Sequence, residues 1–139
     1  MGEALSQSPE SEVEETVGRL FDAMRAGDGA AAAELFRPDA PLQSVSSEGG
    51  EWVVQTRSAD SFVEAIGSAR DEVWDERIWD LEVRVDDGLA TAWMRYAFYL
   101  DDAFSHCGVN AFQLVRAASG WQILQVTDTR RVDDCGEPA

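Results

Sequence analysis

The chain has 139 residues, of which 45% are hydrophobic, and carries a formal net charge of −16 at pH 7. This length and composition are typical of one domain that buries its own core. The strong negative charge repels phosphate backbones and anionic headgroups, so it argues against binding to nucleic acid or to a membrane surface.

The ends of the chain and its two cysteines indicate the cellular compartment and the limits of the domain. There is no apolar run near the roughly 20 residues that span a bilayer, and no signal-peptide pattern, so we expect a cytoplasmic protein. A disulfide between Cys107 and Cys135 is therefore not expected, and neither has metal-ligand spacing to His106, so no metal or other cofactor is predicted. We expect a flexible start over residues 1–9, a single domain over 10–132 and a C-terminal tail over 133–139.

Helical signals dominate the first half of the sequence. Two helix starts remain open: Ser8 as N-cap with Pro9 in the first turn, or Ser11 with Glu14 as a capping box. Apolar residues at helical spacing then run to the glycines of residues 27–29. A second short helix is predicted over 30–36, capped by Asp28, and a third one begins at residue 58 or 60.

Strand signals follow, with short strands expected at 41–45 and 51–55 and long ones after residue 77. Strict alternation over 78–85 places Trp79 on the same face as Leu81 and Val83. The segment 89–100 is apolar on one face and half apolar on the other, which predicts packing on both faces. Helices followed by a meander of antiparallel strands indicate an α+β domain.

Three stretches resemble a known superfamily: VGRLFDAMRAGDGAAAAELFRPDA, GLATAWMRYAFYL and HCGVNAFQLVRAASGWQILQVTDTRR. Over residues 10–131 the chain is similar to nuclear-transport-factor-2-like (NTF2-like) proteins, especially the SnoaL-like and uncharacterised bacterial branches. The resemblance implies a cone-shaped α+β barrel with three helices packed on a strongly curved, mostly antiparallel sheet. It also implies a pocket at the open end and often a dimer through the outer sheet face. Members include isomerases, cyclases, dehydratases and binding modules, so the fold does not assign a reaction. The carboxylate and tyrosine constellation of the ketosteroid-isomerase-like members does not map onto this sequence.

The register of the last hairpin predicts a site. Pairing apolar residues places Leu114 opposite Leu124 and Phe112 opposite Val126, and it then aligns Asn110 with Asp128. Beyond this apolar floor, polar side chains share the same face at the end of the sheet, a composition typical of a ligand pocket. These side chains are His106, Asn110, Asp128 and Arg130.

The chemistry suggested for these residues has a structural alternative. His106 and Asp128 are the candidate catalytic groups, and Asn110, Arg130 and Tyr96 the candidate ligand-binding groups. Alternatively, Asp128 and Arg130 form a salt bridge at the sheet end, and His106 and Tyr96 serve packing.

The other reactive residues are interpreted as structural or as solvent-exposed. Cys107 points away from His106, so a thiol enzyme is not expected. The acidic run that includes Asp75 and Glu76 is interpreted as a solvated, charged edge.

Two functional hypotheses remain open. The first is a pocket protein that binds a small apolar or aromatic metabolite, with cofactor-independent proton-transfer chemistry of the isomerase, cyclase or dehydratase type. The second is a non-catalytic dimerisation or ligand-sensing module. A homodimer through the outer sheet face, including Trp93 and Tyr99, is expected under both.

Overall fold

The computed structural model describes residues 7–68 and 70–136 of the chain. Within these residues it contains three helices, α1 (Pro9–Ala26), α2 (Gly29–Ala33) and α3 (Ala59–Gly67). The described strands are β1 (Pro41–Glu48), β2 (Glu51–Ser58), β3 (Trp74–Asp86), β4 (Leu89–Leu100), β5 (Ala103–Ala117) and β6 (Gly120–Thr129). The flexible start expected at residues 1–9 lies mostly outside the described residues, and Pro9 belongs to α1. None of the described helices is both long and apolar enough to cross a membrane.

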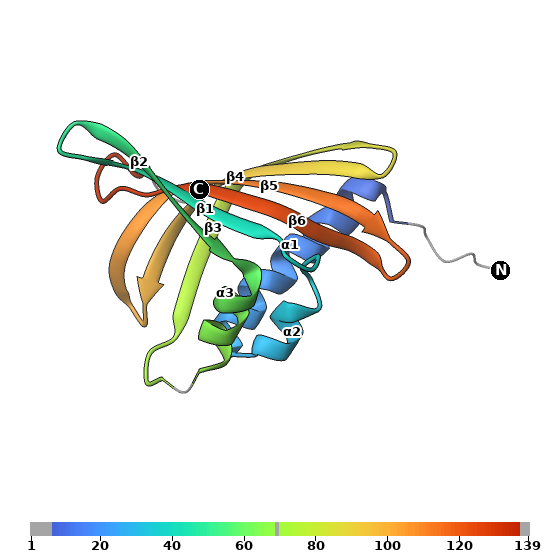
Figure 1. Ribbon diagram of the computed structural model, residues 1–139, viewed down its shortest axis with the longest axis horizontal. Coiled ribbons are helices and arrows are strands. Elements are labelled where there is room, and N and C mark those ends of the chain that lie inside the picture. The colour runs from blue at the N-terminus through green and yellow to red at the C-terminus, as the bar shows by residue number, and fades with distance from the viewer. Residues whose placement is uncertain (1–6, 69, 137–139) are drawn as a thin grey trace.

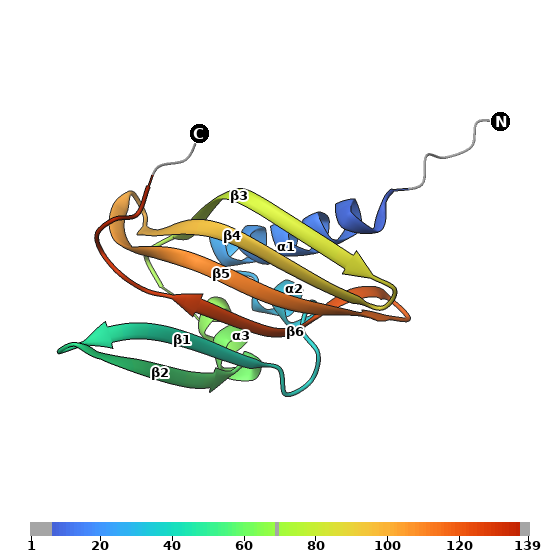
Figure 2. The same ribbon diagram turned by 90° about the horizontal axis from the view of Figure 1, so that it is seen from above.

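The described strands form one curved sheet in the order β2-β1-β6-β5-β4-β3. All neighbouring strands are antiparallel except β1 and β6, which run parallel (Figure 2). The sheet arches over the three helices, and the β1–β2 hairpin projects beyond one end of it (Figure 1). This architecture confirms the predicted α+β class, and the sheet stays open, with β2 and β3 as its edges.

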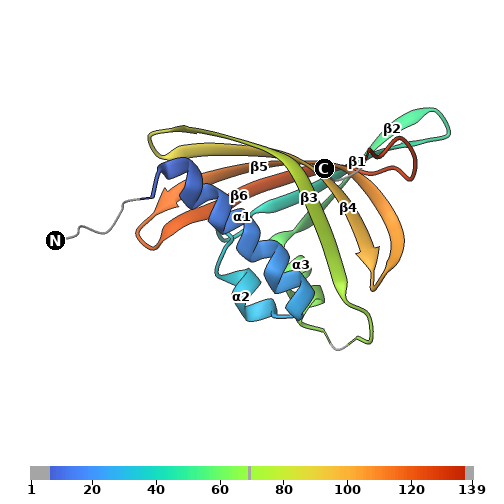
Figure 3. The same ribbon diagram turned by 180° about the vertical axis from the view of Figure 1, so that it is seen from behind.

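Local signals explain the limits of α1. The Ser8 hydroxyl accepts a hydrogen bond from the Ser11 amide at 3.1 Å, so the first of the two predicted starts is the one used. Gly27 ends the helix in the left-handed conformation, with φ of 68°. The apolar stripe of α1 is buried against the concave face, and the helix crosses beneath β3 (Figure 3).

α2 is shorter than the predicted helix over 30–36 because the following backbone pairs with the sheet. The Ile123 amide donates to the Leu35 carbonyl at 2.7 Å, and the Arg37 amide donates to the Ile123 carbonyl at 2.8 Å. These bonds occupy the Leu35 carbonyl and the Arg37 amide, which a continuing helix would use for its own hydrogen bonds.

A bulge in β3 changes which side chains face the helices. Trp79 pairs with Arg95 and Glu82 pairs with Trp93, so two residues, Asp80 and Leu81, span the position of one on β4. Asp80 has a φ of 56°, as one bulge residue commonly does. The prediction that Trp79 shares a face with Leu81 is therefore wrong.

The predicted register of the β5–β6 hairpin is right near the site and wrong near the turn. Asn110 pairs with Asp128 and Phe112 with Val126, as expected. A second bulge then shifts the ladder, so that Leu114 pairs with Ile123 instead of Leu124. Leu124 is consequently exposed, whereas Ile123 is fully buried.

The expectation that the two cysteines stay unbonded is also wrong. Cys107 and Cys135 form a disulfide across 28 residues of sequence. The chain returns along β5 after β6, where Arg131 exchanges both backbone hydrogen bonds with Cys107, and this return brings Cys135 to Cys107. The first residues of the expected tail therefore lie on the outer face of the sheet.

Candidate functional site

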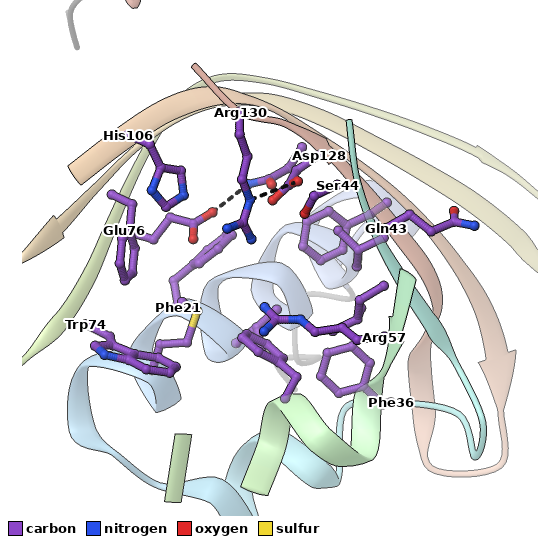
Figure 4. Close-up of a pocket in the computed structure, with 18 of the residues that line it drawn as sticks. Phe21, Phe36, Gln43, Ser44, Arg57, Trp74, Glu76, His106, Asp128 and Arg130 are labelled. Atoms are coloured by element: carbon purple, nitrogen blue, oxygen red, sulfur yellow. Dashed lines mark hydrogen bonds and ion pairs between the residues drawn. The ribbon is translucent and has the colours of Figure 1, made fainter. Parts of the chain in front are cut away.

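A cavity of about 250 Å³ lies between the concave face of the sheet and the helices. Its apolar wall combines aromatic and aliphatic side chains from α1, α3, the sheet and the segment that follows α2. The aromatic members are Phe21, Phe36, Phe62, Trp74, Phe98 and Phe112. Its polar wall consists of Gln43, Ser44, Arg57, Glu76, His106, Asn110, Asp128 and Arg130. Figure 4 shows most of these side chains converging on the cavity. A mainly apolar wall with a few convergent polar groups is the composition of a small-molecule site.

The sheet brings the polar side chains together from different strands. Asp128 on β6 lies between Asn110 on β5 and Ser44 on β1, which are its ladder neighbours on the two sides. Glu76 on β3 pairs with Phe98 on β4, and Phe98 pairs in turn with His106 on β5. Because side chains alternate between faces, these pairings point the polar groups into one space.

Glu76 is the acid of the cavity that is held protonated most strongly. The Asn110 amide nitrogen donates a hydrogen bond to its carboxyl oxygen Oε2 at 2.7 Å. Burial raises the pKa of Glu76 to about 7, Asp128 adds to this effect, and the bond from Asn110 and the charge of Arg130 oppose it. Glu76 therefore changes its charge near neutral pH.

Asp128 is held differently, by a loose ion pair. The Arg130 Nε atom lies 3.6 Å from Asp128 Oδ1, which is too long for a hydrogen bond. Oδ1 is buried and accepts no hydrogen bond within the described residues. Burial raises the pKa of Asp128, whereas the Ser44 hydroxyl and the Arg130 guanidinium act in the opposite direction.

His106 carries no charge at neutral pH. Burial, aided by the nearby Arg130, lowers its pKa to about 4. Its Nδ1 atom lies 3.0 Å from the Ser105 hydroxyl, and its ring packs edge-on against Tyr96 with centroids 5.7 Å apart. The group that titrates near pH 7 in this cavity is thus Glu76 and not His106.

Tyr96 lies behind the site and not on its wall. Its side chain is buried, and its hydroxyl donates to the Thr129 carbonyl at 2.6 Å. Tyr96 is not one of the described residues that line the cavity. Its position fits the packing interpretation, with His106 between Tyr96 and the cavity.

The structure thus lines one cavity with four of the five sequence-predicted residues, His106, Asn110, Asp128 and Arg130. Sequence reasoning missed two charged members of the same wall, Glu76 and Arg57, as well as Ser44. The interpretation of Glu76 as part of a solvated edge is wrong because β3 begins at Trp74, and Trp74, Glu76 and Ile78 alternate inward before the bulge. That short alternation is the signal that could have found it.

Metal ligation finds no support in the geometry of the described chain. Among residues 7–68 and 70–136, no three His, Cys, Asp or Glu side chains lie close enough together to hold a metal ion.

The described chain has the cystatin-like fold that is found in NTF2-like proteins, as comparison with solved structures shows. An NTF2-like protein from Cytophaga hutchinsonii superposes with a TM-score of 0.72 at 11% identity, covering 90% of this chain and 100% of that one. A protein of unknown function from Mycobacterium tuberculosis has a TM-score of 0.68 at 17% identity, with 87% and 70% covered. A protein from Streptomyces avermitilis described as a "putative dehydratase" has a TM-score of 0.68 at 16% identity, with 88% and 96% covered. At these identities the likeness shows the fold alone.

A family model that matches most of the sequence identifies the family. The family model described as "Putative lumazine-binding" matches residues 8–127, so the chain belongs to this family. Comparison with curated proteins finds no match.

Proposed function

We propose that the cavity binds a small aromatic or largely apolar metabolite, and that Glu76 and Asp128 transfer protons to and from it. The observation that carries this proposal is the presence of two half-buried acids, in different environments, on one cavity wall that is rich in aromatic side chains. The reaction class is acid–base chemistry of the isomerase, cyclase or dehydratase type.

The size and lining of the cavity support the binding part of the proposal. An apolar cavity of about 150 Å³ accommodates a benzene ring, so about 250 Å³ has room for a substituted or fused bicyclic ring system. Aromatic side chains supply apolar contact area, and Asn110 supplies an amide for orientation. The family description, which names lumazine binding, also favours a small cyclic ligand.

The two acids support the proton-transfer part. Glu76, with a pKa of about 7, keeps a proton that it can donate to a ligand oxygen. Asp128 is paired with Arg130, which favours its ionised form, so it is the better base. Acids whose environments differ in this way commonly divide the acid and base roles between them. His106, being neutral, supplies a hydrogen bond near them.

Deuterium exchange into 2-tetralone, a bicyclic ketone, tests both parts. In the proposed step Asp128 removes a proton from the carbon beside the carbonyl, and Glu76 donates its proton to the carbonyl oxygen. An enol forms, and reversal in D2O leaves deuterium on the carbon. Binding is followed separately by fluorescence of Trp74, which lines the cavity, with Trp74→Phe as the control; lumazine serves as a second binding probe.

The expected result is exchange faster than in buffer, observed by proton NMR. Asp128→Asn should abolish the acceleration and Glu76→Gln should reduce it by roughly 10²- to 10⁴-fold, the range of general acid–base catalysis. Glu82→Gln, which removes an exposed acid from the same strand, should leave the rate unchanged. Binding without exchange would favour a ligand-sensing module, and absence of both would overturn the proposal.

A homodimer is the second candidate, and the outer face of the sheet favours it. Trp93 is 53% exposed there, in a hollow that it shares with Ala111 and Thr127. The rest of the hollow is lined mainly by polar side chains, and a large aromatic residue such as Trp93 is of the kind enriched where proteins contact one another. Trp93→Glu should convert a sedimenting dimer into a monomer, whereas Val132→Glu, at another exposed apolar site, should not. A wild-type monomer at micromolar concentration would argue against this assembly.

A further inference from the structure

Two guanidinium groups, from opposite sides of the site, face the same cavity. Arg57 is on edge strand β2, where it pairs with the inward-facing Leu42, and Arg130 follows the end of β6. Figure 4 shows both guanidinium groups pointing into the cavity. The Arg57 guanidinium also lies 5.1 Å from the ring centroid of Phe62, which lines the same wall. Its stem and head are thus packed toward the cavity although part of the side chain remains in solvent.

The charge balance of the cavity depends on Glu76, because two guanidinium groups share its wall with two carboxyl groups. Asp128 is the partner of Arg130, at 3.6 Å. Arg57 forms no ion pair and no side-chain hydrogen bond within the described residues. Burial and the charge of Arg130 lower the pKa of Arg57, whereas Asp128 acts in the opposite direction, so the two cations repel each other across a cavity whose acid Asp128 attracts both. When Glu76 is protonated, one positive charge remains without an opposite charge on the wall.

The positive charge of the cavity contrasts with the negative net charge of the whole molecule. The chain carries a net charge of −16, with 27 acidic and 11 basic residues, so a cavity with a positive balance is an exception on this surface. Bringing two guanidinium groups together costs electrostatic energy unless an anion lies between them. A bound anion would reduce the repulsion and would accept hydrogen bonds from both guanidinium groups.

We propose that the ligand of this cavity is a cyclic monoanion whose carboxylate is held between Arg57 and Arg130, with its ring against the aromatic wall. The inference rests on the proposed small-molecule function and narrows its ligand class. One uncompensated positive charge matches a carboxylate better than a phosphate dianion, because Asp128 repels further negative charge. Guanidinium groups also match the geometry of a planar carboxylate through paired N–H donors.

The test compares 2-naphthoate with 2-naphthamide, two ligands of nearly the same shape that differ in charge. Both are titrated by calorimetry at pH 6, where Glu76 is mainly protonated. We expect naphthoate to bind at least roughly tenfold more tightly, as charge-assisted hydrogen bonds predict. Arg57→Gln should weaken naphthoate by roughly 10-fold and leave naphthamide within about 2-fold, because Arg57 is partly exposed and screened.

The control is Arg19→Gln, which removes one positive charge from an exposed position on α1. It should change neither affinity by more than about 2-fold, so that a loss in Arg57→Gln cannot come from net charge. Equal binding of the two probes, or an equal loss of both in Arg57→Gln, would overturn the anion inference while leaving the proposed function intact. Failure of naphthamide, naphthoate and 2-tetralone alike to bind would instead overturn the proposed function itself.

Discussion

Replacing Glu76 with glutamine should flatten the dependence of folding stability on pH between about 4.5 and 7. In the folded protein burial raises the pKa of Glu76 from its ordinary value of 4.5 to about 7. Below pH 4.5 the carboxyl is protonated in both the folded and the unfolded chain. As pH rises toward 7, the unfolded chain releases this proton while the folded chain keeps it, so the free energy of unfolding falls.

The size of the effect follows from the two pKa values. A rise from 4.5 to about 7 corresponds to roughly 3 kcal/mol of lost stability once the pH exceeds 7. This is an upper value because part of the side chain remains accessible to solvent in the cavity. Glutamine has the shape of the neutral acid and retains an oxygen that can accept the hydrogen bond from Asn110, so it should avoid the loss.

Urea unfolding at several pH values from 4.5 to 8.5 measures the prediction. At pH 8 Glu76→Gln should be more stable than wild type by up to roughly 3 kcal/mol, and near pH 4.5 the two should agree. Glu82→Gln is the matched control, because it removes an exposed acid from the same strand and should keep the wild-type slope. If the Glu76→Gln curve runs parallel to that of wild type, the reasoning about a buried acid is refuted.

Three further predictions concern the structure around the site. Tyr96→Phe leaves the partly buried Thr129 carbonyl without this donor and should lower the free energy of unfolding by roughly 1–3 kcal/mol, whereas Tyr99→Phe should not; equal losses in urea unfolding would contradict this. Cys135→Ser opens a disulfide that spans 28 residues and should cost roughly 3 kcal/mol. Dithiothreitol should lower the Tm of wild type but not of this variant, and a wild-type Tm insensitive to the thiol would count against the disulfide. Gly108→Ala drives a methyl group into the Thr129 carbonyl oxygen and should destabilise the protein by several kcal/mol; a near-native Tm would show that the strands are not so close.

The parts of the fold that sequence predicted well are those with strong periodicity. The cap at Ser8 and the apolar stripe that follows it specify α1, and alternation specifies the long strands. The Asn110–Asp128 alignment was predictable because Phe112 and Val126 must both face the core. Bulges were not predictable, since the alternation on either side of each one is regular.

The charged wall of the cavity was only partly predictable for related reasons. His106, Asn110, Asp128 and Arg130 share one strand face, so period-2 reasoning finds them together. Arg57 was not identified from the sequence because the predicted strand ends at residue 55, whereas β2 continues to Ser58 and faces the cavity at Arg57. Glu76 was not identified from the sequence because it stands among other acids, and only the tertiary fold distinguishes an inward-facing acid from its exposed neighbours.

The bulge at Asp80 and Leu81 also determines how the acid of this cavity can be traced in related sequences. In β3 the even-numbered residues face inward before the bulge and the odd-numbered residues face inward after it. The extra residue thus allows both halves of the strand to face the same core. A relative that lacks this residue, aligned by counting back from the turn at 86–88, would have its acid assigned to the wrong face. The gap in such an alignment belongs at Asp80, and whether an acid then falls opposite Phe98 becomes the criterion for grouping relatives by the chemistry of their cavities.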